Sequence, residues 1–223
     1  MNKADALDAA PIVQRCCQNL MKTLVPQTGR IGSAARTAIG DTIALAYDLL
    51  RSDALGPHID QCFALATAAG ATLPKVEHVR LLTSQETPQT LGGTLVQNSL
   101  IQFCLITEAN IIATTVYVSR QDVDNAINQI RQPFYDAIEQ AADDMDQMVY
   151  AGLVALCGAT VNYLVQTQRP LPRMLNYQFI SPSPTLVLAY KLYSDAGRAD
   201  QVRNENKIIH PAFAPSFGQA LSA

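Results

Sequence analysis

The chain has 223 residues, of which 48% are hydrophobic and only 6% aromatic, and its net charge is −3. A chain of this length forms one large domain or two small ones and can bury an apolar core without disulfides or metals. The many alanines and few aromatic residues disfavour a β-sandwich, and the weakly acidic balance excludes a strongly basic nucleic-acid-binding protein. The composition therefore favours close-packed helices.

Three helices are predicted in an N-terminal helical subdomain that covers residues 1–70. Apolar residues recur there at three- and four-residue spacing, and turn residues at 26–29 and at Gly56-Pro57 interrupt the pattern. The expected helices span residues 6–24 (or 11–24), 33–50 and 58–69. Residues 71–88 contain two prolines and are predicted as a connector with a short extended piece.

A bundle of long helices is predicted for residues 89–182. Its first segment, 89–118, is apolar on nearly all sides after Leu100, which is typical of the central helix of a bundle. Ser119 followed by Asp122 resembles a capping box and predicts the start of the next helix. The remaining expected elements are a helix over residues 145–167 and an extended stretch over 175–180.

The C-terminal segment, residues 183–223, is predicted as a helix, a tight turn, a second short helix and an arm. Ser183 can cap the first helix, Pro184 suits its first turn, and Asp195 suits the tight turn. Pro211 ends the second helix, because proline disfavours helical geometry in the residue before it. The whole chain is thus predicted as an all-α multi-helix bundle of about seven to nine helices with an extended C-terminal arm.

This segment also resembles the C-terminal end of the DNA circularisation (DNA circulation) proteins of Mu-like phages and prophages. Both the order and the spacing of the motif agree. The matching residues are Leu188, Ala189, Tyr190, Leu192, Tyr193, Asp195, Ala196, Arg198, Ala199, Asp200, Asn206, Ile209, His210, Pro211 and Phe213. Upstream, Ser119-Arg120-Gln121-Asp122 resembles the family's "SrddA" segment. Residues 193–211 are also loosely similar to LysM-like baseplate modules, which would favour protein docking.

The resemblance covers the C-terminal half well, and family members usually begin with a separate N-terminal domain for which this sequence has no candidate. It implies a tail or baseplate-associated protein, made in the bacterial host cytoplasm and located in the virion tail. The implied partners are other phage tail or baseplate proteins, and we expect a homo-oligomer or a ring partner because tail parts work as rings. The family name implies the alternative, a DNA end-binding protein that protects or circularises injected phage DNA.

The tail of the chain is basic although its body is acidic. Residues 169–223 carry six Lys+Arg and three Asp+Glu, whereas residues 1–168 carry ten and sixteen. The candidate DNA or partner contacts are Arg169, Arg173, Lys191, Arg198, Arg203 and Lys207. With Tyr177, Tyr190 and Tyr193 between them, these cations can contact phosphates while the rings stack on bases. The alternative is that the tyrosines belong to the core and the cations to a solvated face.

A candidate docking arm follows the second short helix. It consists of His210, Pro211, Phe213 and Phe217, and the two phenylalanines are the expected anchors on a neighbouring protein. Because the body of the chain is acidic, we favour a structural role by protein–protein docking at the tail tip over DNA end binding.

No pattern of catalytic or metal-binding residues stands out. The histidines lack ligand spacing, and no phosphate-binding glycine loop occurs. Asp143, Asp144 and Asp146 fit the start of a helix better than a calcium loop. Glu108 lies in an apolar helix and is expected to pair with an arginine or a backbone group, with a catalytic acid as the alternative. We therefore expect no enzyme activity, no cofactor and no metal.

Three further expectations concern the cell compartment. The five cysteines are odd in number and lack a C-x-x-C pair, so we expect reduced, buried thiols, with an intermolecular disulfide as the alternative. The start of the chain carries acids and no apolar core, so no signal peptide is expected.

The uncharged run 147–168 is long enough to span a membrane, but its polar residues favour a buried core helix, with Gly152 and Gly158 at close helix contacts.

Overall fold

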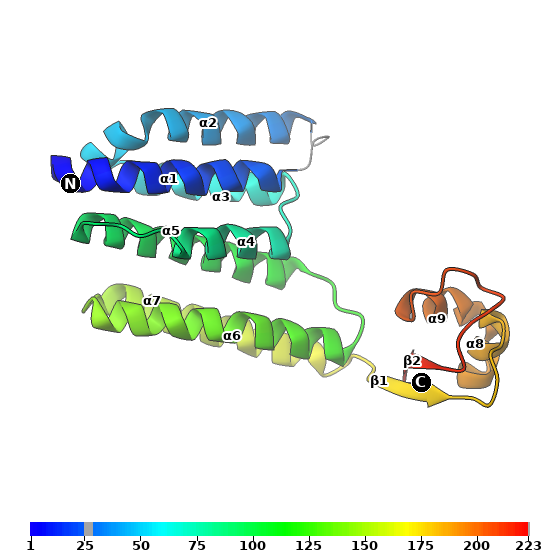
Figure 1. The fold of residues 1–223 in the computed structure, drawn as a ribbon. Coiled ribbons are helices and arrows are strands. Elements are labelled where there is room, and N and C mark those ends of the chain that lie inside the picture. The colour runs from blue at the N-terminus through cyan, green and yellow to red at the C-terminus, as the bar shows by residue number, and fades with distance from the viewer. Residues whose placement is uncertain (25–28, 223) are drawn as a thin grey trace. The chain divides into compact units, whose positions relative to one another are not determined.

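The computed structural model describes residues 1–24 and 29–222. These residues form nine α-helices, one short 3-10 helix and a single two-stranded sheet (Figure 1), which confirms the all-α multi-helix prediction. Most of the break predicted at residues 26–29 lies outside the described residues.

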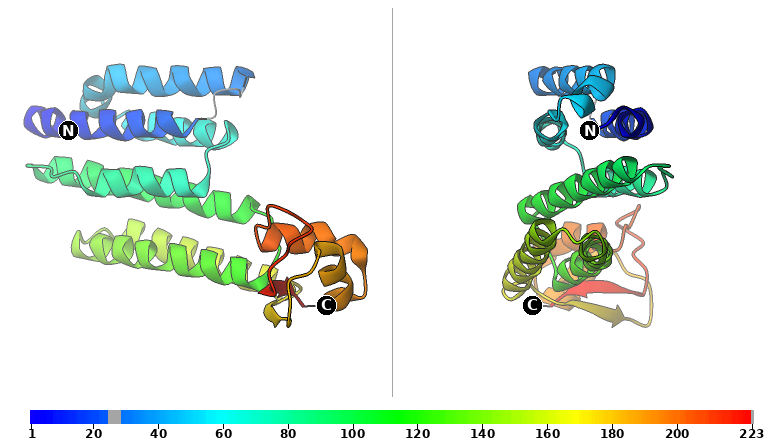
Figure 2. Two further views of the ribbon diagram at one scale, coloured as in Figure 1. Left: turned by 45° about the vertical axis from the view of Figure 1, so that its right-hand side comes forward. Right: turned by 90° about the vertical axis from the view of Figure 1, so that its left-hand side faces the viewer.

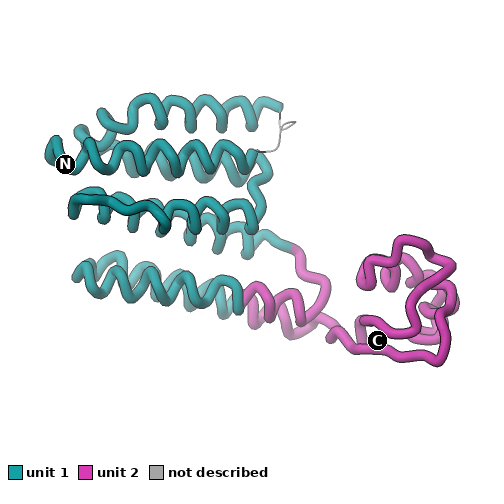
Figure 3. The backbone as a smooth tube through the Cα atoms, in the orientation of Figure 1, with its two compact units in different colours: residues 1–115, 128–163 teal, residues 116–127, 164–223 magenta. Residues whose placement is uncertain are grey.

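The chain divides into two compact units (Figure 3). Unit 1 comprises residues 1–115 and 128–163, and unit 2 comprises residues 116–127 and 164–223. Both units are therefore discontinuous in sequence. The independent folding of the segments 1–70, 71–88, 89–182 and 183–223 stays a prediction.

Unit 1 begins with three helices that pack together (Figures 1 and 2): α1 (Lys3–Thr23), α2 (Gly29–Arg51) and α3 (Leu55–Ala68). The first starts earlier than predicted because the Asn2 side chain caps it, accepting the Asp5 N–H at 2.8 Å. Gly56-Pro57 does not separate α2 from α3 but lies in the first turn of α3, where proline fits because its missing N–H would be unpaired anyway.

The next two helices are α4 (Leu73–Ser84) and α5 (Leu91–Thr114). The prediction of a connector with an extended piece over residues 71–88 is wrong, because Pro74 lies at the start of a helix whose Val76, Val79 and Thr83 are buried. The following helix contacts α1, α3 and α4, as expected for a helix that is apolar all round. Thr90 caps it by accepting the Gly93 N–H at 3.0 Å.

Two long helices, α6 (Arg120–Asp143) and α7 (Gln147–Gln168), lie side by side (Figures 1 and 2). The predicted capping box is confirmed: Asp122 Oδ2 accepts the Ser119 N–H at 3.0 Å, and Ser119 Oγ accepts the Asp122 N–H at 3.2 Å. Within unit 1, Gln129 of α6 donates to Glu77 of α4. These bonds fix where α6 starts and how it meets its neighbour.

The uncharged helix α7 is not the buried core helix that was predicted. Only 22% of its most apolar window is buried, because a single stripe of it packs inward: Leu153, Cys157, Thr160 and Leu164. The structure also contradicts the expected close contacts at Gly152 and Gly158, since no atom lies within 4 Å of a Cβ built at either position. By length and composition alone, α5 and α7 are apolar enough to cross a membrane.

Unit 2 ends in a small α/β arrangement. Its strands β1 (Met174–Gln178) and β2 (Phe217–Leu221) pair antiparallel, with Tyr177 opposite Gly218. Between them run α8 (Thr185–Tyr193), the 3-10 helix η1 (Ala196–Arg198) and α9 (Ala199–Glu205). The core residues are Tyr177, Leu188, Ala189, Val202, Ile208, Ala214 and Ala220. The expected extended stretch is thus a strand, and the end of the predicted arm is its partner.

The cysteines lie where the sequence suggested. Cys16, Cys17, Cys62, Cys104 and Cys157 are all buried and free of disulfides in this chain. The prediction of buried, reduced thiols is therefore confirmed within the chain.

Candidate docking surface of the C-terminal unit

Short local contacts fix the backbone of the C-terminal segment. Ser194 ends α8 in the left-handed region (φ 57°), and Asp195 Oδ1 then accepts the Gly197 N–H at 2.8 Å to form the predicted turn. The Asn206 side chain accepts the Gln219 N–H at 2.7 Å and donates to the Gln219 carbonyl at 2.8 Å. One side chain at the end of α9 thereby fastens β2.

Ser183 does not cap α8, contrary to prediction. Its backbone pairs instead with Ala214, the Ala214 N–H donating to the Ser183 carbonyl at 3.1 Å. The Thr185 N–H donates to the Pro211 carbonyl at 2.7 Å. The start of α8 is thus bonded to the loop after α9, so the predicted docking arm has a fixed backbone.

The side chains of that arm point outward from the fixed backbone. Phe213 is 75% exposed and Phe217 is 71% exposed, while the His210 ring lies 5.2 Å from the Phe213 ring. Pro211 is exposed as well. Two aromatic rings held outward on an ordered backbone lose little conformational freedom when a partner binds.

Further large apolar side chains are exposed on the same unit. They are Leu175, Ile180, Leu186, Val187, Tyr190 and Ile209. Tyr190 is 64% exposed and so does not belong to the core of unit 2, whereas Tyr193 is partly buried and packs against that core. The face of α8 that packs inward carries Leu188 and Ala189. We use the name C-terminal apolar surface for these six side chains together with Phe213 and Phe217; the strand register places Leu175 and Phe217 on opposite faces of the sheet.

Three of the six candidate cations contact other groups of their own chain, and three do not. The Lys191 ammonium lies 5.2 Å from the centre of the Phe179 ring, and the Arg198 guanidinium lies 3.6 Å from the centre of the Tyr193 ring. Arg203 Nε donates to the Ile208 carbonyl at 3.2 Å. These three cations therefore already contact their own chain. Arg169, Arg173 and Lys207 have no such contact among the described residues; they are exposed, as are Lys191 and Arg203.

Three buried side-chain oxygens in this unit lack a hydrogen bond of normal geometry among the described residues. They are Tyr177 Oη, Tyr193 Oη and Glu205 Oε2. Burial raises the pKa of Tyr177, and burial together with the Glu205 charge raises the pKa of Tyr193. Both phenols are therefore neutral at physiological pH.

The one carboxylate considered for catalysis has a structural partner. Glu108 is 2% exposed, and Arg80 Nε donates to its Oε1 at 2.8 Å. Burial raises the pKa of Glu108, and the charge and hydrogen bond of Arg80 oppose that rise. The predicted pairing with an arginine is confirmed.

The prediction that the acidic residues 143–146 fit the start of a helix is confirmed only for Asp146. Asp146 Oδ1 accepts the Val149 N–H at 3.1 Å, as expected at the start of a helix. Asp143, however, is the last residue of α6, and Asp144 accepts hydrogen bonds from the side chains of Asn98 and Gln140. Across residues 1–24 and 29–222, no group of three or more His, Cys, Asp or Glu side chains is arranged to hold a metal ion.

No protein-family model matches the chain, and no curated protein matches it.

Proposed function

We propose that this chain is a structural phage or prophage tail or baseplate-associated protein that docks on other proteins at the tail tip. The observation that carries the proposal is the C-terminal apolar surface, on which Phe213 and Phe217 are more than two-thirds exposed. Large exposed apolar side chains, when they gather on one part of a protein, mark candidate protein-protein contacts. Rigidly held aromatic anchors are also the usual centres of binding energy.

The electrostatics support docking over DNA binding. Lys191 and Arg198 lie against aromatic rings of their own chain, and Asp195 and Asp200 stand among the cations. A dedicated duplex binder instead directs many unpaired cations at phosphates. We propose no catalytic step for the chain, since Glu108 is held by Arg80.

The resemblance of the C-terminal motif to the DNA circularisation proteins supplies the biological setting of the proposal. It links the chain to tail and baseplate genes of Mu-like phages, hence to the virion tail and to tail proteins as partners. A homo-oligomer or ring partner follows from the symmetry of such assemblies.

The test is incorporation of the chain into tail particles of the phage or prophage that encodes it. We expect the wild-type chain in purified tails by quantitative mass spectrometry, and loss of the double variant Phe213→Ser/Phe217→Ser. Leu91→Ser is the matched control, because Leu91 is equally exposed, at 75%, but lies in unit 1. Absence of the wild-type chain from tails, or normal incorporation of the double variant, would contradict the proposal.

The alternative function is DNA end binding, favoured by the net charge of +3 on residues 169–223. Fluorescence anisotropy on linear and circular duplexes, at low and physiological salt, tests it. Salt-sensitive binding that prefers linear DNA and disappears in Arg198→Glu/Arg203→Glu would favour this alternative. The control is Arg30→Glu/Arg36→Glu, which changes the charge equally on exposed residues of α2.

A further inference from the structure

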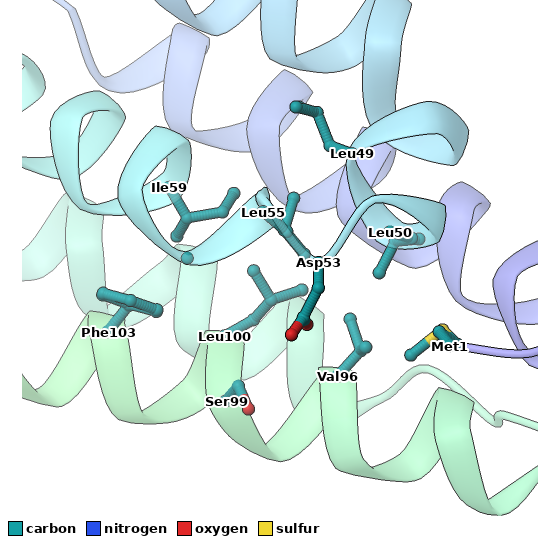
Figure 4. Close-up of a pocket in the computed structure, with 11 residues that line it drawn as sticks. Met1, Leu49, Leu50, Asp53, Leu55, Ile59, Val96, Ser99, Leu100 and Phe103 are labelled. Carbon is teal, nitrogen blue, oxygen red and sulfur yellow. The ribbon is translucent and has the colours of Figure 1, made fainter.

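A pocket in unit 1 is lined by the end of α2, the start of α3 and one face of α5 (Figure 4). Its volume is about 220 Å³, and its apolar wall includes Leu50, Ile59, Val96, Leu100 and Phe103. In another protein, an apolar cavity of about 150 Å³ holds a benzene ring. The pocket is therefore large enough for an alkyl or aryl group.

Met1 also lines the pocket, and Asp53 is the lining residue with a charged side chain. The backbone of Asp53 is unusual. It has φ 58° in the turn after α2, where the Ala54 N–H donates to the Leu49 carbonyl at 2.9 Å. Glycine is the common residue at such a helix end, because a side chain in the left-handed region costs energy. An aspartate here therefore contributes a carboxylate at the expense of backbone strain.

That carboxylate does not cap the following helix. The N-cap residue of α3, Ala54, has no side-chain cap, and no hydrogen bond or ion pair to the Asp53 side chain occurs within the described part of the chain. Figure 4 shows the carboxylate directed from the turn toward the α5 side of the pocket, where Ser99 lies. The carboxylate is exposed to solvent and lies at the mouth of the pocket, with no hydrogen bond or ion pair from the described residues.

Ser99 gives the pocket a second hydrogen-bond acceptor. Its hydroxyl donates to the Leu95 carbonyl at 2.8 Å, so only its oxygen lone pairs remain available. Both polar side chains that line the pocket can thus accept hydrogen bonds, and Asp53 adds one negative charge beside the apolar wall.

We propose that this pocket binds an apolar group that carries an ammonium, its hydrocarbon body on the wall and its charge beside Asp53 and Ser99. Charge complementarity with the unpaired carboxylate selects a cation over an anion. The chemistry is shared by a free alkylamine and by the side chain of a lysine on a partner. The proposal is independent of the role of the C-terminal apolar surface.

The experiment is an NMR titration of the full ¹⁵N-labelled chain with hexylammonium, 1-hexanol, hexanoate and N-acetyl-lysine methylamide. Hexylammonium is expected to bind most tightly, with shifts concentrated at Asp53, Val96 and Ser99. Binding of the lysine compound as well identifies a lysine side chain as sufficient, and binding of hexylammonium alone identifies a free amine. Binding of neither, or of hexanoate as tightly as hexylammonium, overturns the proposal.

Asp53→Gly separates binding from folding. Glycine relieves the positive φ, so the variant should melt at a higher temperature while its affinity for hexylammonium falls roughly fivefold. Its affinity for 1-hexanol should not change. Asp48→Asn, an exposed acid near the end of α2, is the control and should bind like the wild type. Unchanged hexylammonium affinity in Asp53→Gly would overturn the assignment.

Discussion

The buried pair Arg80–Glu108 makes two residues depend on each other. Arg80 is 8% exposed and Glu108 is 2% exposed, so removing Arg80 leaves Glu108 as an unpaired charge in the core, and removing Glu108 leaves Arg80 with only the more distant Glu77, at 3.9 Å. We expect Arg80→Met or Glu108→Leu alone to lower the free energy of unfolding by about 3–5 kcal/mol. The double variant should lose much less free energy of unfolding than the two single variants together, because neither charge of the pair remains. Urea unfolding of the four proteins measures the coupling, and strictly additive losses would contradict it.

Asp8 makes the contact between α1 and α5 sensitive to acid. Desolvation would raise the pKa of Asp8, but hydrogen bonds from Thr90 and Gln89 outweigh it and leave the pKa below its usual value. A carboxylate with a depressed folded pKa stabilises the protein above its unfolded pKa of about 3.9, and this contribution is lost as pH falls through the folded pKa.

The stability that the Asp8 contact loses at low pH can be measured as a change in melting temperature. Between about pH 5 and pH 3, the wild type should lose melting temperature more steeply than Asp8→Asn. At pH 7 the variant should be the less stable protein, since it cannot accept the same charge-assisted bonds. Asp60→Asn, an exposed acid on α3, is the control. Parallel pH profiles for the wild type and Asp8→Asn would show that the contact carries no such linkage.

At the scale of elements, local signals predicted well and distant pairings did not. The Ser119–Asp122 cap spans three residues and is visible in the sequence. By contrast, β2 exists because it pairs with β1 across the intervening helices, and no local pattern shows that pairing. The connector prediction for residues 71–88 fails for a different reason: the prolines there suggest a break, whereas Pro74 lies in the first turn of α4.

The candidate site shows the same division. The exposure of Phe213 and Phe217 was consistent with their proline-rich surroundings, which predict an extended surface segment. The contacts of Lys191 with Phe179 and of Arg203 with the Ile208 carbonyl depend on how the chain folds back, so the sequence did not show them. The outward turn of Tyr190 likewise depends on which face of α8 packs.

The glycines of α7 and α5 should respond oppositely to alanine. Gly152→Ala and Gly158→Ala meet no atom within 4 Å and should each stabilise the chain by about 0.5–1 kcal/mol, because alanine loses less entropy in a helix. Gly93→Ala should destabilise it, since a Cβ there would collide with the Asp8 carboxylate. Thermal unfolding compares the three variants. Destabilisation by Gly152→Ala would mean that the exposed face of α7 packs more closely than the structure indicates.

At the scale of the whole molecule, the two units differ in the size of their buried hydrophobic cores. The core of unit 1 collects buried side chains from α1 through α5, among them Leu20, Ile39, Phe63 and Leu100. The C-terminal core of unit 2 is smaller and contains three alanines. Since the free energy of local opening follows buried apolar contacts, the C-terminal segment should open more easily than the helices of unit 1.

Native-state hydrogen exchange can test this ordering of stabilities. We expect amides in α8 and α9 to be protected roughly a hundredfold less than the best-protected amides of α1 and α5. An opening that exposes α8 and α9 while unit 1 stays folded would release the backbone on which Phe213 and Phe217 are held. Docking of a partner on the C-terminal apolar surface should then raise protection in α8 and α9 and leave α1 unchanged. Equal protection in all four helices would instead mean that the chain unfolds as one cooperative unit, and docking could not stabilise the C-terminal segment selectively.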